Sequence, residues 1–242
     1  MKNTKRLIAL LLALCLFTLL AACKKDPAVT ESTGPVPENV KTSDRAAITE
    51  ADLVGSWTGT VRGNEVGLEI KDDGTMIKTV KGYPFNFTWS YRDGCLYQKD
   101  ASDPNSEETA ATGKVIARTA TELYLCNIGD DDHGFVLHKA NTAYAKREPT
   151  AEEAKLVGVW TANDGTRTVT LDLISDGTCA VAMESGEEMA KYESIWIVEA
   201  GSLYVVDKNA GDDWIKYVLS DVSDKGFTAA DDTGALSFVP MS

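Results

Sequence analysis

The chain has 242 residues, of which 43% are apolar, and its 37 Asp and Glu outnumber 24 Lys and Arg to give a formal net charge of −13. An acidic balance of this size argues against binding to nucleic acid and against a basic face lying on anionic lipid. It favours solubility and, weakly, an affinity for cations.

The first residues have the build of a secretory signal peptide. Lys2, Lys5 and Arg6 precede an apolar run over residues 7–20 that is interrupted only by Thr18. A helix that spans a bilayer needs roughly 20 consecutive apolar residues, so this run is short for that role. A basic start, a short apolar segment and small residues at its end predict that residues 1–22 are removed.

The sequence Leu20-Ala21-Ala22-Cys23 resembles the lipobox of bacterial lipoproteins. The resemblance implies cleavage between Ala22 and Cys23 and a covalent diacylglyceryl group on the Cys23 thiol, with no other cofactor. Two acyl chains anchor a protein stably, whereas one gives only marginal binding. The implied location is the bacterial cell envelope, outside the cytoplasm, on the outer face of the cytoplasmic membrane or on the outer membrane. An ordinary secretory signal followed by an incidental cysteine is the alternative.

Residues 23–50 follow as a polar segment with three prolines and no sustained period of 2 or 3.6. This composition predicts a flexible tether. A coil of about 27 residues would hold the rest of the chain on the order of 30 Å from the membrane.

The remaining cysteines do not form a disulfide framework. Once Cys23 is lipidated, Cys95, Cys126 and Cys179 are left, and three cysteines allow one internal disulfide at most. Cys95 and Cys126 could pair, or each could be a small buried apolar side chain. Because the chain has no Cys/His metal-ligand spacing, we expect no metal site.

The rest of the sequence contains the same unit twice. Residues 53–57 recur 103 positions later at 156–160, and residues 68–75 recur at 171–178. Further on, Trp89 matches Trp196 and residues 96–97 match 203–204 at an offset of 107, so the four extra residues fall in a loop near 184–189. Agreement of separate segments at one offset predicts two β domains, at 51–140 and 155–242. Residues 141–154 are then a linker, which ends in a helix start with capping-box spacing from Thr150 to Glu153.

Each copy reads as a series of short strands. Val66, Leu68 and Ile70 alternate with polar residues, which is typical of a half-buried strand. The pairs Asp73-Gly74, Asp93-Gly94 and Asp176-Gly177 lie between such runs and favour tight hairpin turns. About eight runs per copy, the first set starting near residues 55, 65, 75, 84, 95, 113, 121 and 134, predict an all-β protein. We expect two tandem small antiparallel meander barrels, because closure removes unpaired edges.

A Gly-x-Trp at the first strand, after a short helix, resembles the lipocalin pattern and the small lipocalin-like domains of bacterial lipoproteins. The motif is Gly55-x-Trp57 in the first copy and Gly158-x-Trp160 in the second. The resemblance implies that the tryptophan closes the barrel floor, often under a basic side chain from the last strand. His138 or Lys139 could take that role in the first copy, whereas residues 238–241 of the second offer no basic residue.

Aromatic residues recur on one face of the expected strands. They form either the wall of an apolar ligand pocket or the barrel core, and core is the more common role of such a stripe. The candidates are Trp57, Phe85, Phe87, Trp89, Tyr91, Trp160, Tyr192 and Trp196.

The polar residues show no catalytic pattern. Residues 130–134 (DDDHG) lack the ligand spacing of a calcium loop and are expected to be an acidic hairpin turn, and residues 100–112 to be an exposed loop. His133 and His138 have no serine or cysteine placed beside them by a motif. We therefore assign no catalytic residue and expect a protein that is not an enzyme.

Three functions remain open from the sequence. The first is non-enzymatic binding of a small, partly apolar ligand by lipocalin-like barrels held at the membrane. The second is a structural or protein-interaction module of the envelope, whose partner the sequence does not identify. The third is a hydrolase whose carboxylates meet across a barrel mouth. A fold alone does not decide among them.

Overall fold

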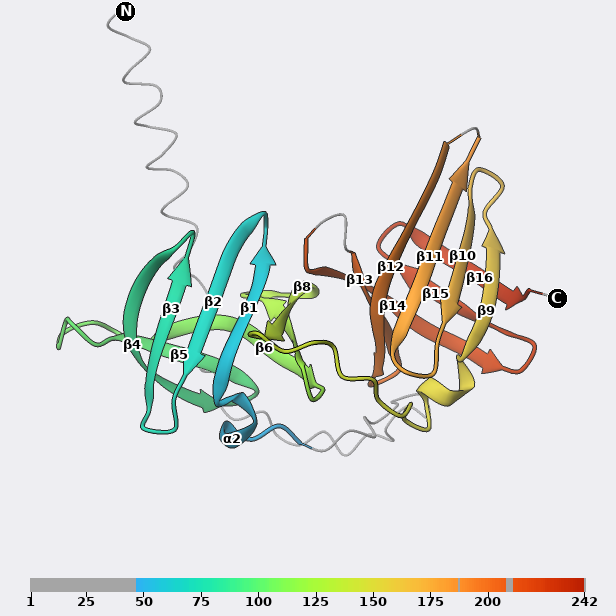
Figure 1. Cartoon of the computed structure of the whole chain (residues 1–242). Helices are drawn as coiled ribbons and strands as arrows, with labels where there is room; N and C mark the ends of the chain where they lie inside the picture. Colours follow the sequence, from blue (N-terminus) through green and yellow to red (C-terminus); the bar gives the residue numbers. More distant parts are fainter. Residues whose placement is uncertain (1–46, 187, 208–210, 242) are drawn as a thin grey trace, which may run out of the picture. The chain divides into compact units, whose positions relative to one another are not determined.

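A computed structural model of the chain describes residues 47–186, 188–207 and 211–241 (Figure 1). The predicted signal peptide, the lipobox with Cys23 and nearly all of the tether lie outside the described residues. Within the described ranges, neither the length nor the hydropathy of any helix is sufficient for a membrane span.

The first copy is an eight-stranded antiparallel barrel that follows a short helix, α2 (Glu50–Leu53). Its strands are β1 (Gly55–Val61), β2 (Asn64–Ile70), β3 (Thr75–Val80), β4 (Tyr83–Arg92), β5 (Cys95–Asp100), β6 (Thr109–Arg118), β7 (Glu122–Asn127) and β8 (Asp130–Lys139). Each strand pairs with the next, and β1 also pairs with β8, which closes the barrel. The predicted antiparallel meander is therefore confirmed for this copy.

Eight further strands follow a 3-10 helix at Glu153–Lys155. They are β9 (Gly158–Asn163), β10 (Thr168–Leu173), β11 (Thr178–Ser185), β12 (Glu188–Glu199), β13 (Ser202–Asp207), β14 (Asp213–Ser223), β15 (Gly226–Asp231) and β16 (Gly234–Pro240). They also pair in chain order, and β16 pairs with β9 through Val239 to Thr161 and Pro240 to Trp160. The described part of the chain is thus all-β apart from short helical pieces before each copy.

Two acidic segments differ from the prediction. Residues 130–134 are not a turn: β8 begins at Asp130, and the turn lies at Ile128 and Gly129, where Gly129 has a φ of 74°. Likewise β6 begins at Thr109, so only part of the predicted 100–112 loop is irregular. Charged side chains can extend a strand beyond the core when they point into solvent, and residues 131–133 are exposed.

The Asp-Gly pairs form turns of two kinds. At Asp93-Gly94 both residues have positive φ, 52° and 74°, as a tight two-residue hairpin requires. At Asp73-Gly74 only the glycine does, and the Asp73 carboxylate accepts hydrogen bonds from the backbone N–H and the hydroxyl of Thr75 at 2.9 and 2.6 Å. Asp176 and Thr178 repeat this arrangement at 3.0 and 2.6 Å.

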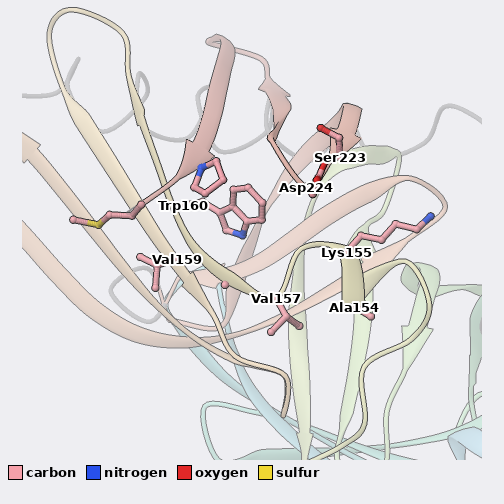
Figure 2. A pocket seen from close by; sticks show the side chains of 10 residues that line it. Ala154, Lys155, Val157, Val159, Trp160, Ser223 and Asp224 are labelled. Atoms are coloured by element: carbon pink, nitrogen blue, oxygen red, sulfur yellow. The ribbon is translucent and has the colours of Figure 1, made fainter.

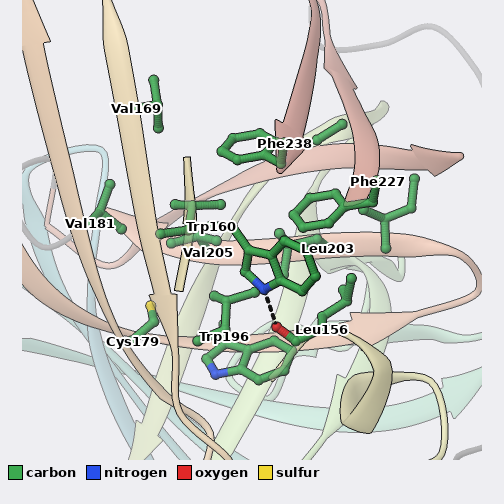
Figure 3. Close-up of a cluster of buried hydrophobic side chains, with 14 of the residues drawn as sticks. Leu156, Trp160, Val169, Cys179, Val181, Trp196, Leu203, Val205, Phe227 and Phe238 are labelled. Carbon is green, nitrogen blue, oxygen red and sulfur yellow. Dashed lines mark hydrogen bonds between the residues drawn. The ribbon is translucent and has the colours of Figure 1, made fainter. Parts of the chain in front are cut away.

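Matched tryptophan hydrogen bonds support the alignment of the two copies. The indole N–H of Trp57 donates to the Leu53 carbonyl at 2.8 Å, and that of Trp160 donates to Leu156 at 2.6 Å (Figure 3). Both carbonyls belong to the short helical segment before the copy. Each Gly-x-Trp tryptophan, 1% and 5% exposed, thereby fixes a helical turn against one end of its strands.

A second pair of bonds extends the match beyond the four-residue insertion. The Trp89 indole donates to the Lys71 carbonyl at 2.8 Å, and the Trp196 indole donates to the Ile174 carbonyl at 3.1 Å. The insertion itself lengthens the β11–β12 hairpin relative to β3–β4, as expected for a loop position.

Aromatic rings fill the core of the second copy, where the last strand offers no basic residue to cover Trp160. Phe227 meets the Trp160 ring edge-on at 5.1 Å, and Phe238 stacks on Phe227 at 4.9 Å (Figure 3). In the first copy, His138 lies 3.0 Å from Asp212 and Lys139 is exposed.

The linker between the copies is held by buried polar contacts. The Arg147 guanidinium donates to both carboxylate oxygens of Glu153 at 2.5 and 3.0 Å, and Glu153 is fully buried. The capping-box expectation is confirmed, because the Thr150 N–H donates to Glu153 at 2.8 Å and the Glu153 N–H donates to the Thr150 hydroxyl at 3.3 Å. The Tyr144 hydroxyl donates to the Asp176 carbonyl at 2.8 Å.

The two copies share a hydrophobic cluster, which we call the junction core. It contains Ala117, Tyr124, Cys126 and Val136 from the first copy and Ile195, Ile197, Tyr204, Val206 and Trp214 from the second. Here β8 pairs with β14, and the Trp214 indole donates to the Leu125 carbonyl at 2.9 Å. The junction core therefore joins the outer face of β7 and β8 to strands of the second copy.

A glycine permits the close approach at the junction core. A Cβ on Gly134, which pairs with Trp214, would lie 1.9 Å from the Leu125 carbonyl oxygen and 2.3 Å from the Trp214 ring. No side chain fits at those distances without a shift of the backbone. Gly134 is thus required for the tryptophan to reach β7.

We expect Trp214→Ala to lower the free energy of unfolding by about 3–5 kcal/mol, because it empties a buried site and leaves a buried carbonyl unpaired. Urea denaturation followed by circular dichroism measures the change. Val218→Ala, on the same strand but 54% exposed, is the control and should change stability by no more than about 0.5 kcal/mol. Equal small effects of both variants would contradict the role given to the junction core.

Candidate ligand-binding site

The inner face of the first barrel is buried at one end and partly exposed at the other. Near α2, Trp57, Leu68 and Met76 are at most 2% exposed. The hairpin turns at residues 62–63 and 81–82 lie at the opposite end, which we call the open end. There, Val66 and the inward-facing residues beside it are only partly buried, and Phe85 is 50% exposed. The barrel is therefore not capped by its own side chains at the open end.

The aromatic stripe of β4 extends along this gradient. Phe87, Trp89 and Tyr91 are partly buried against the core cluster of the first copy, whereas Phe85, which lies nearer the open end, is exposed. Burial raises the pKa of the Tyr91 hydroxyl, which keeps that side chain neutral. Of the other predicted aromatic residues, Trp196 is buried and Tyr192 is partly buried in the second copy.

A lysine lies among these apolar side chains. Lys78 alternates with Met76 and Val80 on β3, and its register partners on the neighbouring strands are Leu68 and Phe85. Its ammonium reaches β6 and donates to the carbonyl of Ala111 at 3.2 Å. Desolvation by this partial burial lowers the pKa of Lys78. None of the ion pairs found among the described residues includes it.

A second polar group lies on the neighbouring part of the wall. Gln98 stands opposite Trp89 in the β4–β5 register, and β5 in turn pairs with β6, the strand that holds Ala111. Its Oε1 atom is buried and finds no hydrogen-bond partner in the described part of the chain. Buried polar atoms are nearly always paired in proteins, so this atom calls for a partner from outside the described chain, a water molecule or a ligand.

The second copy replaces both polar residues with valine. Lys78 aligns with Val181 and Gln98 with Val205, which are 4% and 2% exposed. Val169, the counterpart of the partly buried Val66, is 6% exposed. The equivalent positions of the second copy are therefore apolar and closed to solvent, and the two copies differ at this level of the fold.

Three depressions also lie in the described part of the chain. One, of about 540 Å³, lies beside Trp160, with Lys155 and Asp224 at its rim (Figure 2). A second, of about 410 Å³, is lined by residues that include His133, Trp214 and Lys216. None of the three is lined by the aromatic residues of β4.

The third depression, of about 540 Å³, contains a histidine and a carboxylate from different copies. His138 Nε2 lies 3.0 Å from Asp212 Oδ1, while Asp212 Oδ2 accepts a hydrogen bond from the Thr60 N–H at 2.7 Å. Both carboxylate oxygens thus bind first-copy groups, which fits a structural contact between the copies. His133 is exposed and lies 3.0 Å from Asp130.

The cysteines of the β domains are not cross-linked. Cys95, Cys126 and Cys179 form no disulfide with one another, so the alternative in which Cys95 pairs with Cys126 is wrong. Burial raises the pKa of the Cys126 thiol to about 11, which makes it a poor nucleophile at neutral pH. Among the described residues, no three His, Cys, Asp or Glu side chains are grouped to hold a metal ion.

Lys78 and Gln98 were not among the residues selected from the sequence. Lys78 lies in a run of alternating residues and, taken alone, resembles any solvent-facing lysine. The signal that could have found both residues is the internal repeat, because each aligns with a buried valine of the other copy.

Comparisons with known proteins leave the family open. No protein-family model matches the sequence, and no curated protein shows significant similarity to it. Among solved structures, the chain is similar to a protein of unknown function from the DUF3598 family of Nostoc punctiforme, at 13% identity over 78% of this chain and 94% of that one. The TM-score of this match is 0.21.

We expect Lys78→Val to be at least as stable as the wild type at pH 7, because burying an ammonium costs free energy. The pKa of Lys78 is lowered in the folded state, so the wild type gains stability as the pH rises from that lowered pKa toward about 10.4, the ordinary value for lysine. The advantage of the variant should therefore shrink over this interval, as measured by urea denaturation at pH 7 and pH 10.5.

The exposed Lys191→Val on β12 is the control and should show no such trend. A Lys78→Val protein that is clearly less stable than the wild type at pH 7 would contradict the cost assigned to the ammonium.

Proposed function

We propose that the chain is a lipid-anchored envelope protein whose first barrel binds a small, partly apolar ligand at its open end. The observation that supports this proposal is the exposure of an inward-facing aromatic, Phe85, above the partly buried Phe87 and Trp89. A ligand that covers such apolar surface lowers the free energy of the complex by roughly 25 cal/mol per Å² removed from water.

The two copies have different roles in this proposal. Both are taken as lipocalin-like domains, at residues 51–140 and 155–242, with the Gly-x-Trp tryptophan fixing a helical turn in each. The second copy has Phe227 and Phe238 packed against its tryptophan, so it serves as a filled scaffold. The first copy, with its partly exposed inner face, is the one that binds the ligand.

A non-enzymatic role follows from the groups on the inner face. The inward-facing ionisable residues toward the open end are Lys78, Tyr83 and Asp100, and they do not place a nucleophile and a base together. Binding needs only the apolar wall and a few polar groups that fix orientation, which is the composition of ordinary ligand sites.

A photoreactive dodecanol that carries a diazirine in its chain tests the ligand site. We expect the full-length lipidated protein, in phospholipid nanodiscs, to be labelled within residues 61–100, as mapped by peptide mass spectrometry. Phe85→Asn should reduce this labelling several-fold, because it removes apolar surface from the site. Thr88→Asn, at an exposed position on the outer face of the same strand, is the matched control and should leave it unchanged. Labelling confined to the second copy would refute the proposal.

The membrane anchor is tested separately at Cys23, the residue that the lipobox resemblance marks for the diacylglyceryl group. We expect wild-type protein from bacterial cells to incorporate radiolabelled palmitate and to enter the detergent phase of Triton X-114. Cys23→Ser should lose the label, because a hydroxyl cannot form the thioether. Cys126→Ser should retain it. Equal incorporation by wild type and Cys23→Ser would overturn the anchor.

A further inference from the structure

We propose that the ligand of the first barrel carries an acidic head, such as the carboxylate of a medium-chain acid, and that the Lys78 ammonium binds this head. The inference rests on the proposed function and names the chemical class of its ligand. The acyl chain would lie along Phe85 and Phe87, which share the inner face with Lys78.

The hydrogen-bonding capacity of Lys78 supports an anionic partner. An ammonium has three donors, and the contact with the Ala111 carbonyl accounts for one of them. Carboxylate oxygens accept charge-assisted hydrogen bonds, which are shorter and stronger than neutral ones. A partly buried cation with a single backbone acceptor is therefore a site where an anion can accept the hydrogen bonds that the protein leaves unmade.

The charge of the whole protein sharpens this inference. A chain with a formal net charge of −13 repels anions in general, so a site for an acid needs a local cation shielded from the surrounding carboxylates. The register neighbours of Lys78, Leu68 and Phe85, are apolar, and none of the ion pairs among the described residues joins Lys78 to a carboxylate. A low local polarity strengthens its attraction for a carboxylate that enters the same space.

Gln98 adds a second polar contact for the head. Its amide lies on β5, beside the strand whose Ala111 receives the Lys78 ammonium, and its buried Oε1 has no partner in the described part of the chain. The Oε1 atom only accepts hydrogen bonds and cannot pair with an ionised carboxylate, so the group that would bind the head is the amide nitrogen of the same side chain, which donates. Lys78 and Gln98 thus place both polar partners on an otherwise apolar wall.

The second copy shows that the fold does not need these groups. Val181 and Val205 stand at the equivalent positions and are buried in the core cluster of that copy. Lysine and glutamine at these positions in the first copy therefore serve something other than packing. Lys78→Val and Gln98→Val therefore introduce residues that the second copy already carries at the equivalent positions.

Paired photoreactive probes, a diazirine-bearing dodecanoic acid and the matching dodecanol, test the inference on the full-length lipidated protein in nanodiscs at pH 8. We expect the wild type to be labelled by the acid at lower concentration than by the alcohol. Lys78→Val should raise the half-saturating concentration of the acid about 10-fold or more, since a charged hydrogen bond is lost. The alcohol should change by no more than about twofold. Gln98→Val should weaken the acid less than Lys78→Val does.

Lys191→Val controls for the loss of one positive charge from the protein surface and should leave both probes unchanged. If the wild type binds acid and alcohol equally and Lys78→Val alters neither, the acidic head is wrong while the ligand site stands. If neither probe labels the first copy, the proposed function itself fails. Acid labelling that maps to the second copy would also overturn the inference.

Discussion

Closure of the first barrel depends on the close approach of β1 to β8. Only two register pairs, Trp57 with Lys139 and Thr58 with His138, join these strands. Gly59 follows directly, and a Cβ there would lie 2.7 Å from the Val136 carbonyl oxygen. The absence of a side chain at Gly59 thus lets β1 and β8, the two edge strands of the meander, pair and close the barrel. An open sheet would leave the backbone groups of both edges unpaired. The partly exposed inner face exists because of that closure.

The alternation of apolar residues and the Asp-Gly pairs were enough to predict the all-β meander, and most strands begin within a few residues of the expected positions. The errors occurred where exposed charges extend a strand, as at Asp130, because charge is a weak guide to where hydrogen bonding ends. The candidate site was harder to predict. Alternation places Phe85 and Lys78 on a common face, but how much of each is exposed depends on the lengths and tilts of eight strands, which no local pattern records.

Contacts between the copies were also beyond sequence reasoning. Trp214 has no counterpart in the motifs shared by the repeats, and its acceptor, the Leu125 carbonyl, lies far away in the chain. Backbone carbonyls carry no sequence signal. Gly134 could be recognised only in retrospect, as a glycine at the beginning of an apolar run whose missing Cβ makes room for an indole.

The junction core gives the second copy a structural role toward the first. On β2 the outward-facing residues Glu65 and Glu69 are exposed, as suits a surface strand, whereas on β7 and β8 the outward-facing Tyr124 and Val136 are apolar and buried. Alone, the first copy would expose these side chains as an apolar patch, which favours aggregation. The second copy covers them with side chains that include Ile195, Ile197 and Trp214. The outer face of the first copy is thus packed against the second, while its inner face carries Lys78 and Gln98 where the second copy has buried valines.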